Sequence, residues 1–164
     1  IMTKKLKITG KIIKYALVDD DMFDYLNQWK WNINKEGYVK RGQYTRTKDG
    51  KYKRTEVKLH RLVLQTPKGM VTDHINGNKL DNRRENLRIC TQQQNTWNQK
   101  PYGKSGVVGV WFDKARNKYV AHIGGNGKKT TIGRYNTLEE AIDARDTEAR
   151  KRYGDFAYQN GGTR

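Results

Sequence analysis

The first third of the chain alternates apolar and polar residues at the spacing of β-strands. Residues 11–18, Lys-Ile-Ile-Lys-Tyr-Ala-Leu-Val, predict one such strand. Between residues 20 and 29 the apolar positions return at helical spacing, so we expect a short helix with Asp20 or Asp21 as its N-cap. The aromatic residues that follow favour further strands, separated by glycine-containing turns.

The middle of the chain predicts two short strands separated by polar turns. We expect residues 56–64 to form a strand that runs into an apolar turn, and residues 71–75 to form a second strand. Residues 76–78, Asn-Gly-Asn, mark a turn, and residues 81–86 mark a polar loop. Residues 87–99 predict the end of a strand followed by a helix.

The pattern changes after residues 99–105, whose Pro, Gly and Ser predict a linker. Three strands are expected beyond it: Val107–Phe112, Lys118–Gly124 and Lys129–Tyr135. A helix should follow, because Thr137 and Glu140 have the spacing of a capping box, and Gly154 should end it.

These patterns predict an α+β protein in two parts. Residues 1–98 would form a small β-rich segment followed by a section, residues 56–98, that carries the chemistry. Residues 106–160 would form a three-stranded antiparallel sheet packed on one helix, and residues 161–164 a frayed tail. Only 34% of the 164 residues are hydrophobic, which favours two thin cores over one large core.

The charge balance indicates a polyanionic partner. Lys and Arg number 34 against 17 Asp and Glu, a formal net charge of +17. Each phosphate that such a surface neutralises releases condensed counterions, so nucleic acid is the expected partner. The alternative is a merely soluble basic protein. No apolar run approaches the ~20 residues that span a bilayer, so no membrane partner is expected. With DNA as the expected partner, no small-molecule substrate is expected either.

Cysteine and histidine are too few for a structural zinc site. Cys90 is the single cysteine, which excludes an internal disulfide and favours a reducing cytoplasm. The three histidines, His60, His74 and His122, lie far apart in the sequence and give no usual zinc ligand set.

The residue types of a phosphodiesterase gather between residues 59 and 98. Cutting a phosphodiester requires a base that titrates near neutral pH, for which His74 is suited. It also requires a hard cation at the scissile phosphate, and Asp73 and amide oxygens are the ligands that Mg²⁺ prefers. Adjacent residues on a strand point to opposite faces, so Asp73 could hold metal while His74 meets the water.

Four motifs occur here in order: His-Arg-Leu-Val at 60–63, Asp-His-Ile-Asn-Gly-Asn at 73–78, Asp-Asn-Arg-Arg-Glu-Asn-Leu-Arg at 81–88, and a trailing Gln-Asn that ends at Asn95. Together they resemble the HNH endonuclease motif, the ββα-metal fold of phage and intron-encoded homing endonucleases. The resemblance implies a nuclease that leaves 5′-phosphate and 3′-hydroxyl ends, with one site cutting one strand.

The resemblance also implies the role of each residue. His74 would be the general base, and Asp73 and Asn95 would hold one Mg²⁺ or Mn²⁺ ion. The residue that orients the base would be Asn86, twelve residues after His74, with Asn82 as the second choice. His60 belongs to the lead-in of the motif, which implies packing or a hydrogen bond rather than catalysis.

Candidate DNA contacts occur in both parts. Arg83, Arg84 and Arg88 are either phosphate clamps or residues of a solvated face. Residues 106–160 resemble the plant APETALA/ethylene-response-factor DNA-binding domain, although Trp111 stands where those domains have a base-reading Arg. Trp111 is either a DNA contact or a core anchor. The resemblance and the strand alternation together propose the following DNA-facing residues: Trp111, Arg116, Lys118, His122, Lys128, Lys129 and Arg134.

The sequence therefore predicts a site-specific homing endonuclease acting on double-stranded DNA. We expect it to be phage-encoded and to work in the cytoplasm of a bacterial host. Two alternatives stay open: a non-catalytic DNA-binding regulator on an HNH scaffold, and an RNA-binding protein. The target sequence, nicking against double-strand cleavage, and the oligomeric state do not follow from the sequence.

Overall fold

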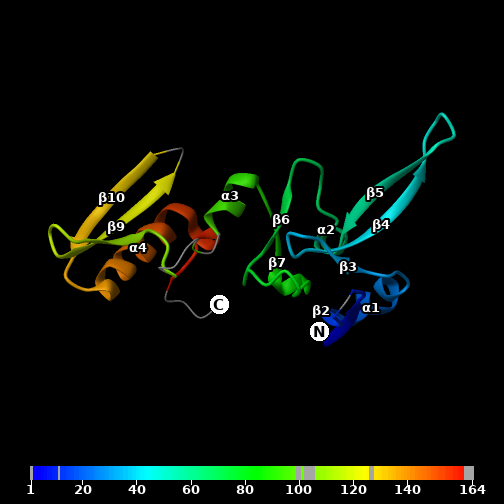
Figure 1. The fold of residues 1–164 in the computed structure, drawn as a ribbon, viewed down its shortest axis with the longest axis horizontal. Helices are drawn as coiled ribbons and strands as arrows, with labels where there is room; N and C mark the ends of the chain where they lie inside the picture. The colour runs from blue at the N-terminus through cyan, green and yellow to red at the C-terminus, as the bar shows by residue number, and fades with distance from the viewer. Residues whose placement is uncertain (1, 11, 99–100, 102–105, 126–127, 161–164) are drawn as a thin grey trace. The chain divides into compact units, whose positions relative to one another are not determined.

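The computed structural model describes residues 2–10, 12–98, 101, 106–125 and 128–160. The chain divides into two compact units, Ile1–Gln92 and Gln93–Arg164, each with its own sheets and helices (Figure 1). The division falls before residue 98, where the sequence predicts the nuclease section to end. The predicted linker, except Pro101, and the predicted tail lie outside the described residues.

Unit 1 begins with an antiparallel pair of strands, β1 (Thr3–Ile8) and β2 (Lys14–Asp19). Helix α1 (Asp20–Asn27) follows without a break, and its N-cap is Asp19 rather than the predicted Asp20 or Asp21. The cap differs because β2 stays extended through Asp19. The side chain of Asp19 makes no cap hydrogen bond and binds elsewhere in the unit.

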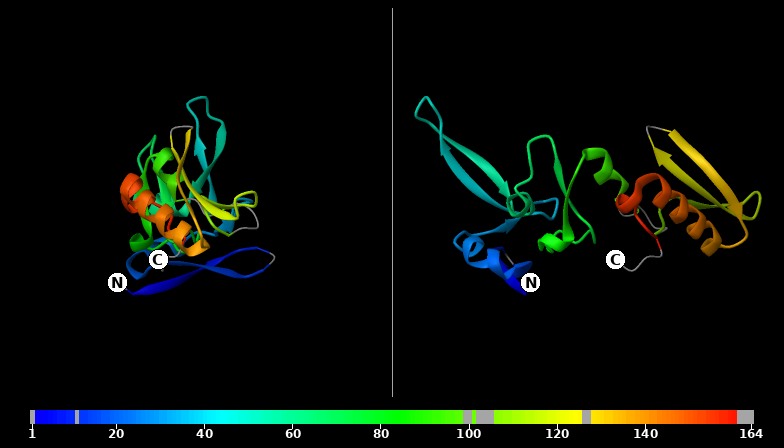
Figure 2. Two further views of the ribbon diagram at one scale, coloured as in Figure 1. Left: turned by 90° about the vertical axis from the view of Figure 1, so that its left-hand side faces the viewer. Right: turned by 180° about the vertical axis from the view of Figure 1, so that it is seen from behind.

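The second sheet of unit 1 contains β3 (Asn32–Ile33), β4 (Val39–Arg46) and β5 (Tyr52–Lys58), in the order β3-β4-β5. Strands β4 and β5 form a long antiparallel hairpin. Its turn contains Gly50 at φ 82°, a conformation that glycine adopts at little cost. The hairpin projects away from the rest of unit 1 (Figure 2).

Helix α2 (Leu59–Leu64) corrects the prediction for residues 56–64. The strand ends at Lys58, and the next residues are helical instead of forming an apolar turn. Leu59 and Val63 are one helical turn apart and both are buried, which places one apolar face of this short helix in the core. The helix ends at Gln65, whose φ of 49° is left-handed.

The section with the candidate chemistry contains a two-stranded sheet of β6 (Val71–His74) and β7 (Leu87–Cys90). The loop between them includes a 3-10 turn, Arg84–Asn86. The core of unit 1 takes residues from β1, β2, α1, β4, α2 and β7, and its buried residues are Leu6, Ile8, Ala16, Val18, Leu26, Trp31, Val39, Leu59, Val63 and Leu87.

Helix α3 (Gln92–Trp97) begins at the boundary between the units. In unit 2 the ring of Trp97 stacks on Tyr153, with ring centroids 4.5 Å apart. The backbone N–H of Tyr158 also donates to the carbonyl of Trp97 at 3.1 Å. The end of α3 is therefore fixed to the C-terminal part of the chain.

Unit 2 contains the three predicted strands, β8 (Val110–Asp113), β9 (Lys118–Gly125) and β10 (Lys128–Tyr135), in the antiparallel order β10-β9-β8. Helix α4 (Leu138–Tyr153) covers one face of this sheet (Figure 1), and a 3-10 turn, Gly154–Phe156, follows it. The capping box of Thr137 and Glu140 is confirmed, because each side chain accepts a backbone N–H of the other residue.

Two small clusters form the core of unit 2. Val110, Ala121 and Ala141 form one, and Ile123, Ala149 and Ala157 the other. No helix in the described part of the chain is both long and apolar enough to cross a membrane.

Candidate active site

Asp73 and His74 end strand β6, and both are buried. Arg88 is the cross-strand partner of Asp73 on β7. The Oδ2 atom of Asp73 lies 2.9 Å from Nε and 2.7 Å from Nη2 of Arg88. The strand pairing thus places a cation beside this buried carboxylate.

The imidazole of His74 contacts Asn82. Its Nε2 atom lies 3.3 Å from Oδ1 of Asn82, while Nδ2 of Asn82 donates to the carbonyl of Lys79 at 3.2 Å. An amide oxygen can only accept, so this network gives the proton to Nε2 of His74. The lone pair of the neutral ring is then on Nδ1, the atom that could take a proton from water.

The N-terminal strands hold Asn82 in place. Asn82 is fully buried, and its backbone N–H donates to the carbonyl of Leu17 at 2.8 Å. Leu17 in turn donates to the carbonyl of Leu80 at 2.8 Å. Strand β2 therefore fixes the loop on which Asn82 lies, a support that the sequence pattern did not reveal.

Asn86 has a different set of contacts. Its Nδ2 donates to the carbonyl of Asp81 at 2.8 Å, and its Oδ1 accepts the backbone N–H of Asn76 at 3.0 Å. Its own carbonyl accepts from Ile75 at 2.8 Å. Asn86 thus ties together the two ends of the loop. The ring of His74 instead donates its hydrogen bond to Asn82, which the sequence ranked second, because the loop turns the Asn82 side chain inward.

Electrostatics keeps His74 neutral. Burial lowers its pKa below the usual value, and the hydrogen bond that the ring donates to Asn82 and the carboxylates of Asp73 and Asp81 only partly oppose this. A neutral imidazole near pH 7 is the form that can act as a base.

A second buried histidine lies beside His74. The ring of His60 is 5.2 Å from that of His74, centroid to centroid, and the ring of Tyr38 is 5.0 Å from His60 and 6.1 Å from His74. Burial, followed by the neighbouring His74, lowers the pKa of His60 to about 3. His60 is therefore an uncharged packing residue at neutral pH, in line with the structural role that its motif position implied.

Arg83 and Arg84, two of the proposed phosphate clamps, make ion pairs inside unit 1. Arg83 binds both oxygens of Asp81, at 2.8 and 2.7 Å, and this pair lowers the pKa of Asp81. Arg84 binds Asp21 at 2.8 Å and reaches Asp19 at 3.4 Å. With Arg88 on Asp73, all three arginines stabilise the loop and the site.

The donor set near His74 fits a hard divalent cation. Among the described residues no cluster of three or more His, Cys, Asp or Glu side chains is placed to hold a metal. One carboxylate, Asp73, suits an ion such as Mg²⁺ that keeps several of its own waters. The other predicted ligand, Asn95, lies on α3 in unit 2 and is half-buried.

The predicted DNA-facing residues of unit 2 lie mostly on one face of its sheet. Tyr119, Ala121 and Ile123 of β9 pack toward α4, so the alternate residues and their cross-strand partners face away from it. The residues on this open face are Trp111, Lys118, His122, Lys129 and Arg134. Trp111 is 51% exposed and so is no core anchor.

Two proposed residues lie off this face. Arg116 follows β8 and pairs with Asp113 at 3.1 Å. Lys128 is exposed at the start of β10. Its cross-strand partner, Gly125, alternates in step with the β9 residues that face α4, so Lys128 does not belong to the open face.

Comparison with known proteins identifies the class of the site. Residues 57–96, which contain every candidate site residue of unit 1 together with Asn95, match the HNH endonuclease family model named HNH_3. The chain is 29% identical over 153 residues to the uncharacterized HNH endonuclease L560 of Acanthamoeba polyphaga mimivirus, covering 89% of this chain and 74% of that protein.

Two further relatives come from a phage and a prophage. Identity to protein 3.8 of Escherichia phage T7 is 32% over 93 residues, which cover 56% of this chain and 76% of that protein. Identity to YosQ, an SPbeta prophage-derived protein of Bacillus subtilis (strain 168) whose name proposes an HNH homing endonuclease, is 42% over 69 residues, or 39% and 38% of the two chains.

Residues 57–96 therefore form an HNH endonuclease domain; nucleases of this family act on DNA and generally use a divalent metal ion. None of these matches supports the resemblance of residues 106–160 to the plant DNA-binding domain, whose strands and helix are nevertheless present.

Proposed function

We propose that this protein is a site-specific homing endonuclease that hydrolyses phosphodiester bonds of double-stranded DNA. The observation that carries the proposal is the pair Asp73 and His74 at the end of β6, with the ring of His74 oriented by Asn82. The names of the relatives and the HNH family match support the same activity.

In the proposed reaction Nδ1 of His74 accepts a proton from water. The water oxygen attacks phosphorus, the bond from phosphorus to the 3′ oxygen breaks, and that oxygen takes up a proton. The products are a 5′-phosphate and a 3′-hydroxyl. Asn82 keeps Nε2 protonated, so that the basic nitrogen stays on the other side of the ring.

Asp73 would hold the cation, and Asn95 remains the second ligand that the sequence proposes. A bound Mg²⁺ or Mn²⁺ ion would neutralise charge on the scissile phosphate and on the leaving 3′ oxygen. Arg88 shares the Asp73 carboxylate and would restrain its orientation.

Unit 2 would provide further DNA contacts through the open face of its sheet, and Lys129 and Arg134 are the exposed cations there. Phosphate contacts of this kind set position, and base contacts set the target sequence. We also propose that the protein is phage-encoded and acts in the cytoplasm of a bacterial host, since its relatives include phage and prophage proteins.

Incubation of the purified protein with supercoiled plasmid tests the proposal. We expect nicked circles with Mg²⁺, none with a chelator, and nicks whose 3′-hydroxyl a DNA polymerase can extend. DNA binding without cleavage, with either Mg²⁺ or Mn²⁺, would instead indicate a regulator on an HNH scaffold.

A further inference from the structure

The β4–β5 hairpin of unit 1 presents a basic, aromatic face that the candidate active site does not use. Cross-strand partners share a face, and the pairs Tyr44 with Arg54 and Arg46 with Tyr52 lie on the same one. We call these four residues the tyrosine–arginine face. Toward the base of the hairpin the same face continues through Glu56 and through Lys40 paired with Lys58.

The tyrosines of this face are exposed to an unusual degree. Tyr44 is 66% and Tyr52 is 73% exposed, so neither ring contributes to the core. Large aromatic side chains left outside a core, and flanked by polar groups, are typical of interaction surfaces. Arg46 and Arg54 beside them are exposed as well.

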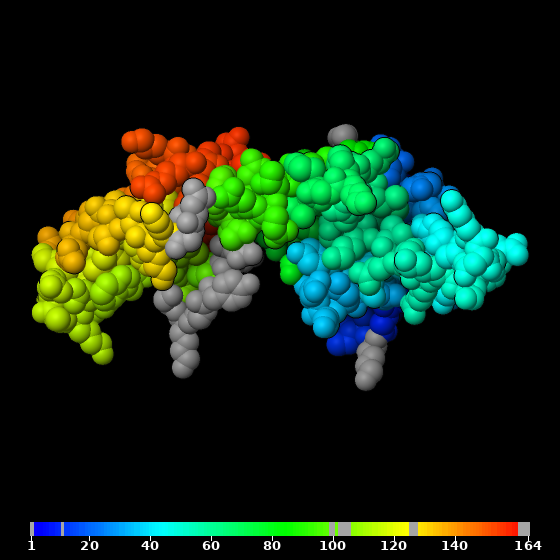
Figure 3. Space-filling view, turned by 90° about the horizontal axis from the view of Figure 1, so that it is seen from above, coloured from blue at the N-terminus to red at the C-terminus, as the bar shows by residue number. Residues whose placement is uncertain are grey.

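The opposite face of the hairpin is anchored to unit 1 at its base. There the guanidinium of Arg41 lies 4.3 Å from the ring of Trp29 and 5.8 Å from that of Trp31. Val57, its cross-strand partner, is half-buried. The residues of the tyrosine–arginine face make no such contact with the tryptophans and stay exposed. Figure 3 shows the hairpin, in cyan, as a projection from unit 1.

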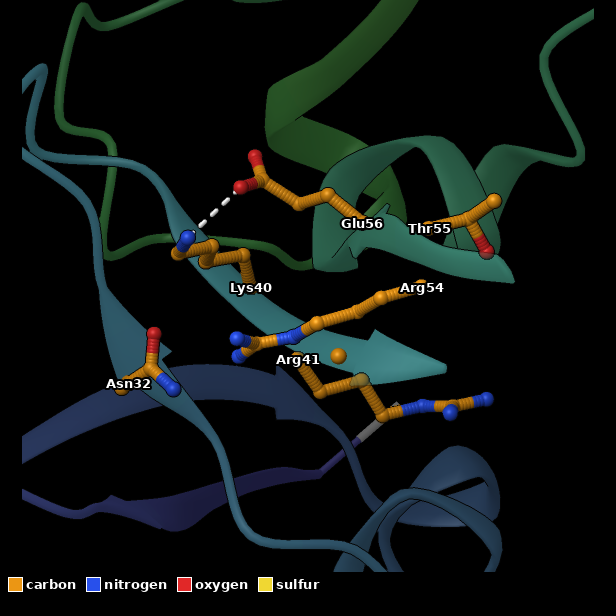
Figure 4. A pocket seen from close by; sticks show the side chains of 7 residues that line it. Asn32, Lys40, Arg41, Arg54, Thr55 and Glu56 are labelled. Carbon is orange, nitrogen blue, oxygen red and sulfur yellow. Dashed lines mark hydrogen bonds and ion pairs between the residues drawn. The ribbon is translucent and has the colours of Figure 1, made fainter. Parts of the chain in front are cut away.

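A cavity of about 290 Å³ lies at the base of this face, lined by Asn32, Lys40, Arg54 and Glu56 among others. The side chain of Arg54 crosses Gly42, where a Cβ would come within 3.1 Å of its Nε atom. Its guanidinium points toward Asn32 across the cavity, while the amine of Lys40 is held by Glu56 at 2.6 Å (Figure 4).

None of the described residues accepts a hydrogen bond from the Arg54 guanidinium or forms an ion pair with it. A planar cation with free donors at the mouth of a cavity is suited to a phosphate group, which it can bind through two parallel hydrogen bonds.

The hairpin also leads to the candidate active site. The amine of Lys58, at its base, lies 5.3 Å from the ring of Tyr38, and Tyr38 packs beside His60 and His74. Helix α2, which carries His60, begins at the residue after Lys58. A duplex bound along the hairpin would therefore have a fixed position relative to His74.

We infer that the tyrosine–arginine face binds duplex DNA through the major groove, with Arg54 on a backbone phosphate. The major groove is about 12 Å wide and admits a two-stranded β-ribbon. The eight residues of β4 extend roughly 27 Å at ~3.4 Å per residue, enough to follow the groove over several base pairs. The deep, narrow major groove of duplex RNA would not admit the hairpin.

Two neighbouring residues of β5 provide a matched test, since Arg54 lies on the proposed face and Lys53 on the opposite one. The full chain carrying His74→Ala, in the presence of a chelator, would be titrated onto a duplex that contains its mapped cleavage site. Arg54→Gln should weaken binding several-fold and lower the slope of log affinity against log salt by about 0.9, the value for one phosphate. Lys53→Gln, with the same change of charge, should change both much less.

The inference rests on the proposed function, and the arms of the experiment separate the two. If Arg54→Gln and Lys53→Gln weaken binding equally while the unaltered chain still cuts plasmid with Mg²⁺, the hairpin inference is wrong and the nuclease stands. If the chain neither binds nor cuts duplex DNA, both are wrong.

Two further arms test the groove. The pair Tyr44→Ser and Tyr52→Ser should shift the cleavage map, whereas unchanged cleavage sites and affinity would contradict base contact. Duplex RNA should compete poorly, and equal competition would overturn the major-groove assignment.

Discussion

Two regions of unit 1 are rich in arginine and use it in opposite ways. Around the active site, Arg83, Arg84 and Arg88 bind buried or half-exposed carboxylates at 2.7–3.4 Å. On the β4–β5 hairpin, Arg46 and Arg54 are exposed and pair with no carboxylate among the described residues. The net charge alone gives no way to tell these groups apart.

The difference teaches which charges are available to DNA. When an arginine leaves a buried carboxylate, the carboxylate stays buried without a partner, which costs several kcal/mol. An exposed arginine or lysine loses only solvent contacts when it meets a phosphate, and it gains by counterion release. We therefore expect the paired arginines to stabilise the site and the exposed cations to bind DNA.

The largest expected effect follows from removing the carboxylate of the active-site region. Asp73→Ala should lower plasmid cleavage about a thousandfold or more, because a cation that supplies several kcal/mol would lose its ligand. Binding to duplex DNA should remain. Single-turnover cleavage and a Mn²⁺ titration would measure this, with Asp24→Ala, an exposed carboxylate on α1, as the control. Normal cutting by Asp73→Ala at low Mg²⁺ would show that the ligand assignment is wrong.

Substitution of the two asparagines of the loop should lower different properties, the cleavage rate for Asn82 and the stability for Asn86. Asn82→Ala should slow cleavage roughly tenfold to a hundredfold, as expected for a residue that orients a functional imidazole. Asn86→Ala removes two hydrogen bonds to buried backbone and should instead lower the free energy of unfolding by about 2 kcal/mol or more.

Cleavage rates and urea unfolding of the two asparagine variants would be compared at one temperature. The assignment of Asn82 would have to be abandoned if Asn86→Ala, while still folded, lost as much activity as Asn82→Ala.

His60 should make folding sensitive to acid. Its folded pKa of about 3 lies below the ordinary 6.5. Between these two pH values His60 is therefore protonated in the unfolded chain and neutral in the folded protein. The contribution of neutral His60 to the free energy of unfolding is fully present above pH 6.5 and decreases as the pH falls toward 3. At pH 5 the loss is about 2 kcal/mol, from 1.36 kcal/mol per pH unit.

Replacement of His60 by phenylalanine should remove this part of the pH dependence. Between pH 7 and pH 5 the free energy of unfolding of His60→Phe, measured in urea, should fall by about 2 kcal/mol less than that of the unaltered protein. Identical losses would show that His60 is not kept neutral by the fold.

The smallest expected effect concerns the exposed cations of unit 2. The double variant Lys129→Gln and Arg134→Gln should lower the slope of log affinity against log salt by about 1.8, or 0.9 for each phosphate contact. Arg84→Gln, which removes a paired charge, should change the slope little. The opposite ranking in a salt titration would contradict the distinction between paired and exposed arginines.

Local signals predicted unit 2 well. The capping box of Thr137 and Glu140 is complete within four residues, and the helix and strands lie close to where their patterns placed them. Helix α2 was missed because six residues are too few to show a helical period, and because Leu59 follows strand β5 directly.

Contacts between distant parts of the chain could not be predicted. Asn82 faces His74 because Leu17 on β2 makes backbone hydrogen bonds to Leu80 and to Asn82 itself. The backbone N–H and the guanidinium of Arg84 both reach Asp19, 65 residues earlier in the chain. Spacing along the motif favoured Asn86 as the partner of the imidazole, but loop conformation, which depends on β2, decides between the two asparagines.

The central claim is that His74 is the base of a DNA-cutting site, and the most direct test is His74→Ala in single-turnover plasmid cleavage at saturating protein and Mg²⁺. Removal of a general base should slow cleavage by roughly a hundredfold to ten-thousandfold and leave DNA affinity nearly unchanged, because the base acts on the chemical step. Cleavage at the unaltered rate, or a loss of affinity that accounts for the whole loss of activity, would contradict the claim.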